Sequence, residues 1–247
     1  MREVELDLPR WPPALNGLRV AMVSDLHAGG PHIDLDRVER VAAVVASLRP
    51  DLFALLGDSM DPEVTFGGRL EPEPVAERLG RVRPPLGSVA VLGNHDWDDD
   101  GPRIAEALRD TGVRVLENEA VRLARVPEEL WVAGLADAST RRPDVTRALA
   151  AVPDDATVLM LSHDPDVFPR VPERVALTLS GHTHGGQVDL PIVKRSWIPS
   201  RFGERYAGGH VVEDGRHLLI SRGIGNSTFP VRLGVPPEVV HMTLRAV

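Results

Sequence analysis

Residues 18–27 read LRVAMVSDLH, an apolar run that ends abruptly in a polar cluster. The run at 18–23 follows an Asn-Gly turn signal, so turn or loop residues lie on both sides of it, and we predict a buried strand. The stretch LFALLGD at residues 52–58 repeats the arrangement, with a second predicted strand and Asp58 directly behind it. An apolar strand followed at once by a polar loop is therefore the recurring unit of this chain.

A segment with helical periodicity separates these two strands. Apolar side chains between 35 and 48 fall on one helical face, Asp34 can cap the helix at its start, and Pro50 ends it. A short helix is also predicted around residues 104–109. Further strands are predicted at 89–92, 112–116, 131–135, 157–161, 175–179 and 218–221. The early alternation of strand and helix, with closer strand spacing later, predicts an α/β sandwich with mixed sheets.

The polar residues best suited to chemistry follow the predicted strands directly. They are Asp25 and His27, Asp58, Asn94, His95 and Asp96, His163, and His182 and His184. Because α/β proteins assemble sites at the carboxyl ends of their strands, we expect these loops to meet. Each piece alone is weak evidence, since Gly-Asp occurs in ordinary turns and a lone histidine such as His163 is more often structural. Their occurrence after five separate strands indicates one shared site.

The ordered set of these residues resembles the signature of the calcineurin-like metallophosphoesterases. The matching motifs are D-x-H at 25–27, G-D at 57–58, G-N-H-D at 93–96, a histidine at 163 and G-H-x-H at 181–184. The segments HGGQVDLP at 184–191 and SRGIGNS at 221–227 are similar to the bacterial phosphodiesterase subgroup that includes YaeI and YkuE. The resemblance covers nearly the whole chain. It implies a four-layer α-β-β-α sandwich with two mixed sheets and the activity of a phosphodiesterase-like hydrolase.

The resemblance also implies a dinuclear metal centre. It assigns Asp25, His27 and His184 to one metal, Asn94, His163 and His182 to the other, and Asp58 to a bridging position between them. These are mixed oxygen and nitrogen donors without sulfur, which suits manganese, with iron or zinc as alternatives. Two divalent cations against two carboxylates and one hydroxide would leave a positive site for a phosphate anion.

The resemblance assigns a catalytic role to His95. In this family the equivalent residue protonates the departing oxygen while a metal-bound hydroxide attacks phosphorus in line. Asp96 could hydrogen-bond to His95, fix its orientation and favour its imidazolium form. It could equally be a plain turn residue, and the sequence leaves both interpretations open.

The bulk composition limits what else the protein can be. A chain of 247 residues with no cysteine predicts one domain over residues 1–247 and excludes thiolate and disulfide chemistry. The net charge of −8 disfavours nucleic acid as the main partner. No apolar run has the length of a membrane span, and residues 1–13 (MREVELDLPRWPP) do not read as a signal peptide. We therefore expect a cytoplasmic protein, with any membrane association peripheral.

The expected substrate is a small phosphate ester, and the subgroup resemblance favours a diester, of a lipid head group or a nucleotide. The Pro- and Gly-rich stretches at 62–74 and 185–209 are interpreted as long loops, which often carry function in compact domains. Residues 190–206 combine apolar side chains with basic ones such as Arg201 and Arg205. They could form a lip that receives an apolar diester, or a surface loop with its apolar side chains turned inward.

Two other functions are compatible with parts of the pattern. A scaffold of this fold could bind a protein partner without turnover, but such scaffolds typically lose metal ligands or the catalytic histidine, and this chain keeps all of them. A zinc hydrolase of the metallo-β-lactamase type would need a compact H-x-H-x-D-H cluster. Here His184 is followed by Gly-Gly-Gln, so that reading fails.

Overall fold

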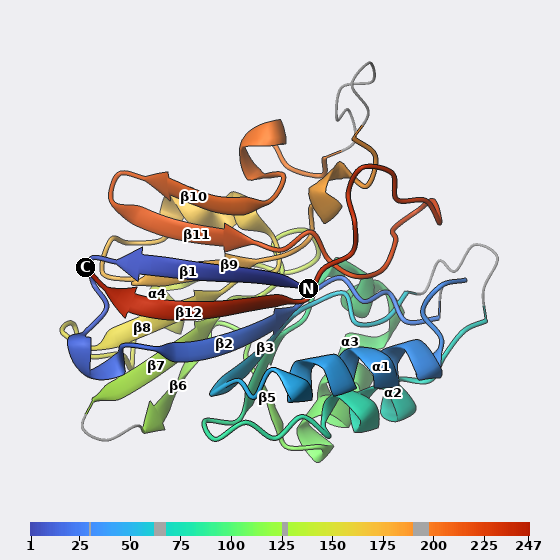
Figure 1. The fold of residues 1–247 in the computed structure, drawn as a ribbon, viewed down its shortest axis with the longest axis horizontal. Helices are drawn as coiled ribbons and strands as arrows, with labels where there is room; N and C mark the ends of the chain where they lie inside the picture. The colour runs from blue at the N-terminus through green and yellow to red at the C-terminus, as the bar shows by residue number, and fades with distance from the viewer. Residues whose placement is uncertain (30, 62–67, 125–127, 190–197) are drawn as a thin grey trace.

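The computed structural model describes residues 1–29, 31–61, 68–124, 128–189 and 198–247, which form two β-sheets packed face to face (Figure 1). In these residues the first sheet has the strand order β1 (Arg2–Leu8), β12 (Val240–Ala246), β2 (Leu18–Val23), β3 (Leu52–Leu56), β4 (Ser88–Val91) and β5 (Val113–Val115). The second has the order β10 (Gly209–Glu213), β11 (Arg216–Ile220), β9 (Leu177–Ser180), β8 (Thr157–Leu161), β7 (Glu129–Gly134) and β6 (Glu119–Ala124). Both sheets are mixed, because β12 runs antiparallel to β2 in the first, and β6 and β10 run antiparallel to their neighbours in the second.

Helices cover the outer face of each sheet and complete four layers. The first sheet is covered by α1 (Leu35–Ser47), α2 (Pro72–Leu79) and α3 (Asn94–Asp110). The second is covered by shorter turns, namely α4 (Val145–Ala148), η2 (Pro165–Arg170) and η4 (Gly203–Tyr206). Three clusters of buried apolar side chains fill the three spaces between the layers. The expected α-β-β-α sandwich with two mixed sheets is therefore confirmed.

The elements nearest the predicted site form where the sequence places them. Strands β2, β3 and β8 have the predicted bounds, because a strand buried on both faces leaves a continuous apolar run in the sequence. Helix α1 begins after Asp34, whose side chain accepts a hydrogen bond from the backbone N–H of Arg37 at 2.7 Å. Its buried residues repeat at helical spacing and face the first sheet.

Other elements differ from the predictions. The stretch 62–74 is not loop throughout, since α2 begins at Pro72, and residues 62–67 lie outside the described residues. The predicted short helix at 104–109 is the second half of the longer α3, which starts at Asn94 and is interrupted by a non-helical residue at Asp100. The residues after β4 therefore begin a helix rather than a loop.

The parallel strands β2, β3 and β4 end at the same edge of the first sheet, and β8 and β9 end at the corresponding edge of the second. Figure 1 shows these strand ends gathered at the right-hand side of the molecule, with the turn between β10 and β11 at the other end. Among the described residues, no helix is long and apolar enough to cross a membrane.

Candidate metal centre

All the predicted site residues occupy this loop end. Asp25 and His27 follow β2, Asp58 follows β3, Asn94, His95 and Asp96 form the first turn of α3, His163 follows β8, and His182 and His184 follow β9. Hydrogen bonds join the loops to one another: the N–H of Asp25 donates to the carbonyl of Gly57 within the first sheet, and the N–H of His182, from the second sheet, donates to Oδ1 of Asp25 at 2.9 Å. The two sheets thus contribute to one cluster.

The backbone of this cluster is strained. Five of the seven predicted ligands have positive φ angles, namely Asp25, His27, Asp58, His182 and His184, at 48° to 70°. Residues other than glycine rarely adopt this conformation, and each instance costs on the order of 1 kcal/mol. A fold keeps such strain only where surrounding structure enforces it, and it is typical of sites where side chains must point in unusual directions.

Four of the predicted ligands form one compact group of donor atoms. Asp25, His27, Asp58 and His184 each offer an atom within 4.8 Å of the others, and all four residues are buried. The Nε2 atoms of His27 and His184 are 3.0 Å apart, and Nε2 of His184 lies 3.5 Å from Oδ1 of Asp25. Nitrogens bound to one cation at about 2.1 Å lie roughly 3 Å apart at right angles, so this spacing fits a shared metal.

A second group shares Asp58 with the first. It contains Asp58, His163 and His182, with Oδ2 of Asp58 lying 3.1 Å from Nε2 of His163. Nδ1 of His182 is 3.2 Å from the same Nε2. Nδ1 of His163 lies 2.6 Å from the carbonyl oxygen of Leu56, to which it can donate, and this orients Nε2 toward Asp58. Asn94 precedes His95, whose N–H donates to Oδ1 of Asp58 at 3.0 Å, and so lies beside this group.

The side chains of the two groups are suited to binding divalent cations. Among the buried side-chain atoms without a hydrogen-bond partner are Oδ2 of Asp25, in the first group, and Oδ1 of Asn94, beside the second. A buried polar atom without a partner costs free energy, so such atoms at the centre of a cluster point to a ligand that would satisfy them. Carboxylate, amide and imidazole donors together suit a divalent cation of intermediate hardness. The buried cluster could therefore hold divalent metal ions.

The titrating groups of the cluster influence one another strongly. Burial opposes ionisation of Asp58, but the adjacent His163 outweighs it, so the pKa of Asp58 is lowered. Burial alone would lower the pKa of His163, yet Asp58 raises it well above its usual value. For His184, burial and then the proximity of His27 and Arg232 hold the pKa well below its usual value. These shifts favour a charged pair of Asp58 and His163, whose Oδ2 and Nε2 atoms lie 3.1 Å apart, and a neutral His184.

His95 lies beside the cluster and Asp96 beneath it. Nε2 of His95 is 3.4 Å from the hydroxyl of Ser227, and its side chain is 17% exposed, so it can reach a ligand. Asp96 is fully buried, and its carboxylate accepts hydrogen bonds from the N–H groups of Gly93, Ser59 and Met60. These bonds fix the loops that carry Asn94 and Asp58. Burial and the charge of Asp58 raise the pKa of Asp96 to about 7.

The sequence leaves open whether Asp96 hydrogen-bonds to His95 or is a plain turn residue, and the hydrogen bonds of its carboxylate in the structure follow neither interpretation. The two residues are adjacent in the sequence, which suggested a bond between them. In the first turn of α3, however, the Asp96 carboxylate accepts a hydrogen bond from the backbone N–H of Gly93, and this bond caps the helix. Asp96 holds loops together rather than orienting His95.

Asp61 is a residue of the site that the sequence analysis did not predict. It is buried, its Oδ1 lies 4.0 Å from Nδ1 of His95, and its Oδ2 lies 3.5 Å from Nδ1 of His27. The carboxylate thus lies between the proposed proton donor and a proposed ligand. The available signal was the spacing Asp58-x-x-Asp61 in the same loop.

The loop at 190–206 is only partly described, because residues 190–197 lie outside the described residues. Of the basic side chains that could reach a phosphate, Arg201 pairs with Asp166 and Arg205 with Glu213. Phe202 packs against Tyr206. The described part of this loop therefore favours the interpretation of a packed surface loop.

The chain is similar in sequence to known phosphoesterases. Residues 18–186 match the family model of the calcineurin-like phosphoesterases. A transmembrane protein with a metallophosphoesterase domain from Danio rerio is 30% identical over 98% of this chain, which spans only 56% of that relative's length. The phosphodiesterase YaeI of Escherichia coli is 28% identical, covering 92% of this chain and 82% of its own.

A solved structure supports the fold. The NAD nucleotidase NadN of Haemophilus influenzae superposes with a TM-score of 0.51 at 14% sequence identity, over 82% of this chain and 49% of that chain.

Proposed function

Because the chain belongs to the calcineurin-like phosphoesterases, we propose that it hydrolyses a phosphate ester, specifically a phosphodiester, at a dinuclear metal centre. The observation that carries this proposal is the position of Asp58, whose carboxylate belongs to two groups of potential metal ligands at once. Resemblance to the phosphodiesterase YaeI supports a diester over a monoester.

Seven side chains would hold the cations. Asp25, His27 and His184 would bind one, Asn94, His163 and His182 the other, and Asp58 both. Manganese is the proposed physiological metal, since the set combines hard oxygen donors with imidazoles. When bound, such cations lower the pKa of water to about 7 and offset the charge of a phosphate group.

The protein's own contribution to the reaction is proton transfer and positioning. Nε2 of His95 would donate a proton to the ester oxygen as its bond to phosphorus breaks, which makes the alkoxide a better leaving group. Asp61, whose Oδ1 lies 4.0 Å from Nδ1 of His95, would attract the protonated ring electrostatically and so help to keep Nε2 directed at the substrate. Asp96 would fix the relative positions of the loops that carry Asp58 and Asn94, because its carboxylate accepts three backbone hydrogen bonds from them.

The test is hydrolysis of bis(p-nitrophenyl) phosphate by manganese-loaded protein, with the metal content of the same sample measured by mass spectrometry. We expect about two metals per chain and measurable turnover. Asp58→Ala should lose both, whereas Asp155→Ala, the same substitution at an exposed site away from the cluster, should retain both.

Each contrary result has a distinct meaning. Fewer than one metal in well-loaded protein would remove the dinuclear centre from the proposal. Full metal content without hydrolysis of any phosphodiester tested would favour the scaffold alternative, in which the fold binds a protein partner without turnover.

A further inference from the structure

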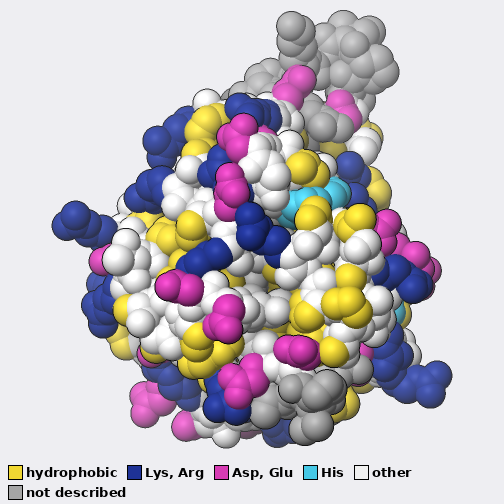
Figure 2. Space-filling model, turned by 90° about the vertical axis from the view of Figure 1, so that its left-hand side faces the viewer, with side chains coloured by type: hydrophobic (Ala, Val, Ile, Leu, Met, Phe, Trp, Pro, Cys, Tyr) yellow, Lys and Arg dark blue, Asp and Glu magenta, His cyan; other side chains and the backbone are white. Residues whose placement is uncertain are grey.

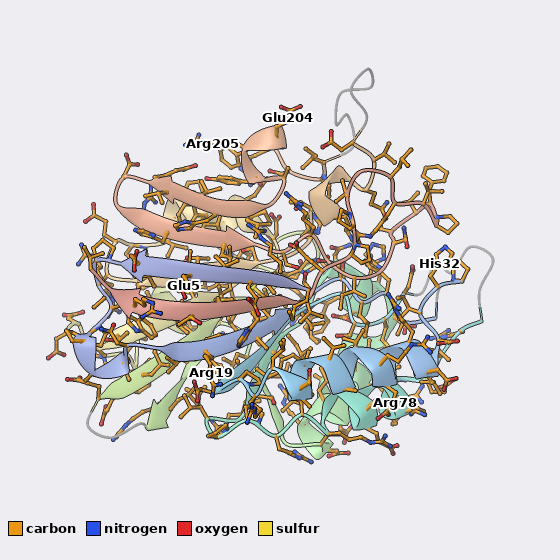
Figure 3. All side chains as sticks on the ribbon, in the orientation of Figure 1. Glu5, Arg19, His32, Arg78, Glu204 and Arg205 are labelled. Carbon is orange, nitrogen blue, oxygen red and sulfur yellow. The ribbon has the colours of Figure 1, made fainter. Side chains whose placement is uncertain are left out.

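A groove runs between α1 and residues 224–239, next to the metal centre but outside it. It has two adjoining chambers, of about 550 Å³ and about 160 Å³, which share Arg37, Arg40, Ile224 and Pro237 in their walls. The larger lies within the range of volumes that small-molecule sites occupy. We call the whole feature the arginine groove. Figure 3 shows His32, which lines the larger chamber, at the loop end of the molecule beside α1.

The larger chamber is cationic. Arg37, Arg40, Arg232 and His32 line it, and no described residue in its wall is acidic. Neither Arg37 nor Arg40 forms an ion pair with another described residue. Elsewhere arginines commonly have carboxylate partners, such as Arg103 with Glu73. The opposite end of the molecule shows acidic and basic side chains interspersed (Figure 2). In a chain of net charge −8, unpaired guanidinium groups that converge on one chamber indicate an anionic ligand.

Arg232 adds a partly buried cation to this chamber. Its Nε donates to the carbonyl of Gly225 at 2.7 Å, and its two terminal nitrogens contact the carbonyl oxygen and Nδ1 of His184 at 3.3 and 3.1 Å. These contacts can use three of the five N–H groups of a guanidinium, so two remain for a ligand. The guanidinium is thereby held in place before any ligand binds, which lowers the entropic cost of binding.

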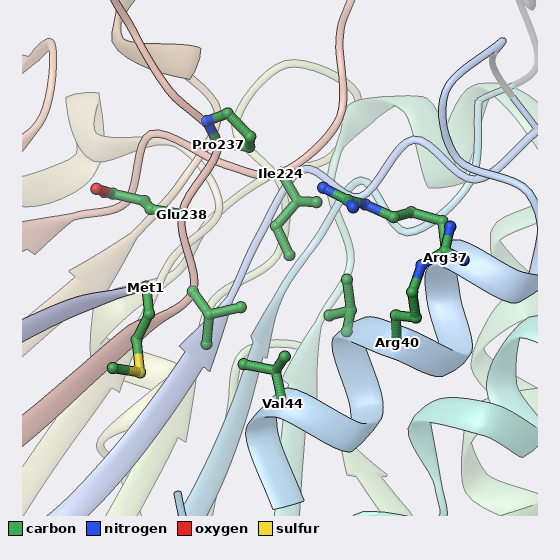
Figure 4. Close-up of a pocket in the computed structure, with 9 residues that line it drawn as sticks. Met1, Arg37, Arg40, Val44, Ile224, Pro237 and Glu238 are labelled. Atoms are coloured by element: carbon green, nitrogen blue, oxygen red, sulfur yellow. The ribbon is translucent and has the colours of Figure 1, made fainter. Parts of the chain in front are cut away.

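The smaller chamber is mainly apolar. Val41, Val44 and Val239 line it together with Met1 and Ile224, and Val44 is 41% exposed. Glu238 also contributes to the wall, but its carboxylate points away from Arg37 (Figure 4). That carboxylate already accepts a hydrogen bond from the N–H of Arg222 at 2.9 Å. Figure 4 also shows Arg37 reaching from α1 toward Ile224, at the junction of the two chambers.

The groove and the metal centre are distinct sites that adjoin at Arg232, which lines the groove and contacts the proposed ligand His184. Gly225 packs so closely against the loop of His27 that a Cβ there would lie 2.2 Å from the carbonyl oxygen of Leu26 and 2.9 Å from Cβ of His27. Ile224 and Asn226, on either side of it, line the groove. One thickness of backbone therefore divides the two sites, and none of the seven proposed metal ligands lines the groove.

We infer that the arginine groove binds an anionic amphiphile, a phosphate-type group carried on a hydrocarbon chain. The anionic group lies among Arg37, Arg40 and Arg232, and the chain extends over Val41 and Val44. A cationic chamber next to an apolar one favours a molecule that has both an anionic group and a hydrocarbon chain. The inference does not depend on hydrolysis at the metal centre.

The test is calorimetric titration of manganese-loaded protein with decyl phosphate below its micelle concentration. Inorganic phosphate supplies the head group alone, and decyl maltoside supplies the chain on an uncharged head. The double variant Arg37→Gln, Arg40→Gln should weaken decyl phosphate binding about tenfold or more, because two charge-assisted contacts are lost. Arg142→Gln with Arg147→Gln removes the same charge from exposed positions elsewhere and should leave the affinity within about twofold.

A second substitution tests the apolar chamber. Val44→Asp should weaken decyl phosphate and leave inorganic phosphate much less affected, while Val212→Asp, at a comparably exposed valine of β10, should change neither. Thermal unfolding of every variant separates a lost site from a lost fold. Hydrogen exchange should show slower exchange over Leu35–Ser47 when decyl phosphate binds.

Several outcomes would overturn the inference. Unchanged decyl phosphate affinity in the folded Arg37→Gln, Arg40→Gln variant would remove the groove as the site. Inorganic phosphate binding as tightly as decyl phosphate would reduce it to a simple anion site, and equally tight decyl maltoside would remove the anion requirement. Binding to phosphatidylglycerol vesicles without binding of monomeric decyl phosphate would assign the surface to a bilayer instead. Loss of phosphodiester hydrolysis with binding intact would contradict only the proposed function.

Discussion

The backbone of Gly93 approaches the carboxylate of Asp58 so closely that a Cβ at position 93 would lie 2.2 Å from Oδ1 of Asp58. The same Cβ would lie 2.7 Å from Cε1 of His163. With a φ of −103°, position 93 itself accepts any residue, so only the lack of space requires glycine. The G-N-H-D motif thus begins with a residue that makes room for the proposed bridging ligand.

Gly93→Ala should therefore displace Asp58 and His163 and reduce metal binding. We expect a loss of about 1–3 kcal/mol in the free energy of unfolding, as for other overpacked positions. Metal content and chemical denaturation measure the two effects. Gly68→Ala is the matched control, since a Cβ there meets nothing within 4 Å. Normal metal content in Gly93→Ala would show that the loops can shift without harm.

His95→Ala should keep its metal and lose most of its turnover. The side chain lies beside the ligand groups and donates no atom to either of the two that share Asp58. We expect turnover to fall by roughly 10²–10⁴, the usual contribution of a general acid. A substrate whose leaving group needs no proton, such as p-nitrophenolate, should be affected less than an alkyl ester. Equal rates for wild type and variant on the alkyl ester would remove His95 from the mechanism.

Asp61→Asn should reduce turnover through His95. Its carboxylate faces Nδ1 of His95, so replacing it weakens the orientation of the ring without removing the proton donor. The expected loss is about 10–100-fold, as for other residues that orient a functional side chain. In a His95→Ala background the same substitution should cost much less, because the two residues act as a unit. Additive losses, or loss of metal from Asp61→Asn, would instead indicate that its contact with His27 dominates.

The sequence predicts the parts of the fold that leave a buried apolar run, such as β3, or an apolar helical face, as in α1. Strands β3 and β8 are buried along almost their whole length, so their letters alone reveal them. The terminal strands β1 and β12 alternate polar and apolar residues and escaped prediction. The start of α3 reads NHDWDDDGP, with a glycine and a proline that argue against a helix. It is helical because Gly93 and Asp96 cap it.

The residues of the site were predictable from their type and their position directly after a strand. The orientations of their side chains were not. The ligand candidates were found because each follows an apolar strand. The orientation of the Asp96 carboxylate depends on three backbone N–H groups from two loops, which no local pattern reveals. Arg232 contacts His184 from 48 residues further along the chain, so only the tertiary structure brings it to the site.

Metal binding should release a proton near neutral pH. Burial alone would lower the pKa of His163, but Asp58 raises it well above its usual value, so at pH 7 the metal-free protein holds a proton on His163. A metal ligand must be deprotonated, and this proton has to leave. Below the raised pKa the apparent dissociation constant should therefore rise about tenfold per unit fall in pH. His184 contributes no such proton, because burial and then His27 already hold its pKa well below the usual value.

Calorimetric titration with manganese in two buffers of different ionisation enthalpy counts the released protons directly. Wild-type protein should release protons when metal binds at pH 7, from His163 and from His27, whose pKa is lowered by burial but raised overall by Asp61 and Asp58. Asp58→Asn removes the charge that holds the proton on His163, so any residual binding should release fewer. A heat signal that is the same in both buffers would contradict the proposed ion pair between His163 and Asp58. Proton release that persists unchanged in Asp58→Asn would assign the proton to another group.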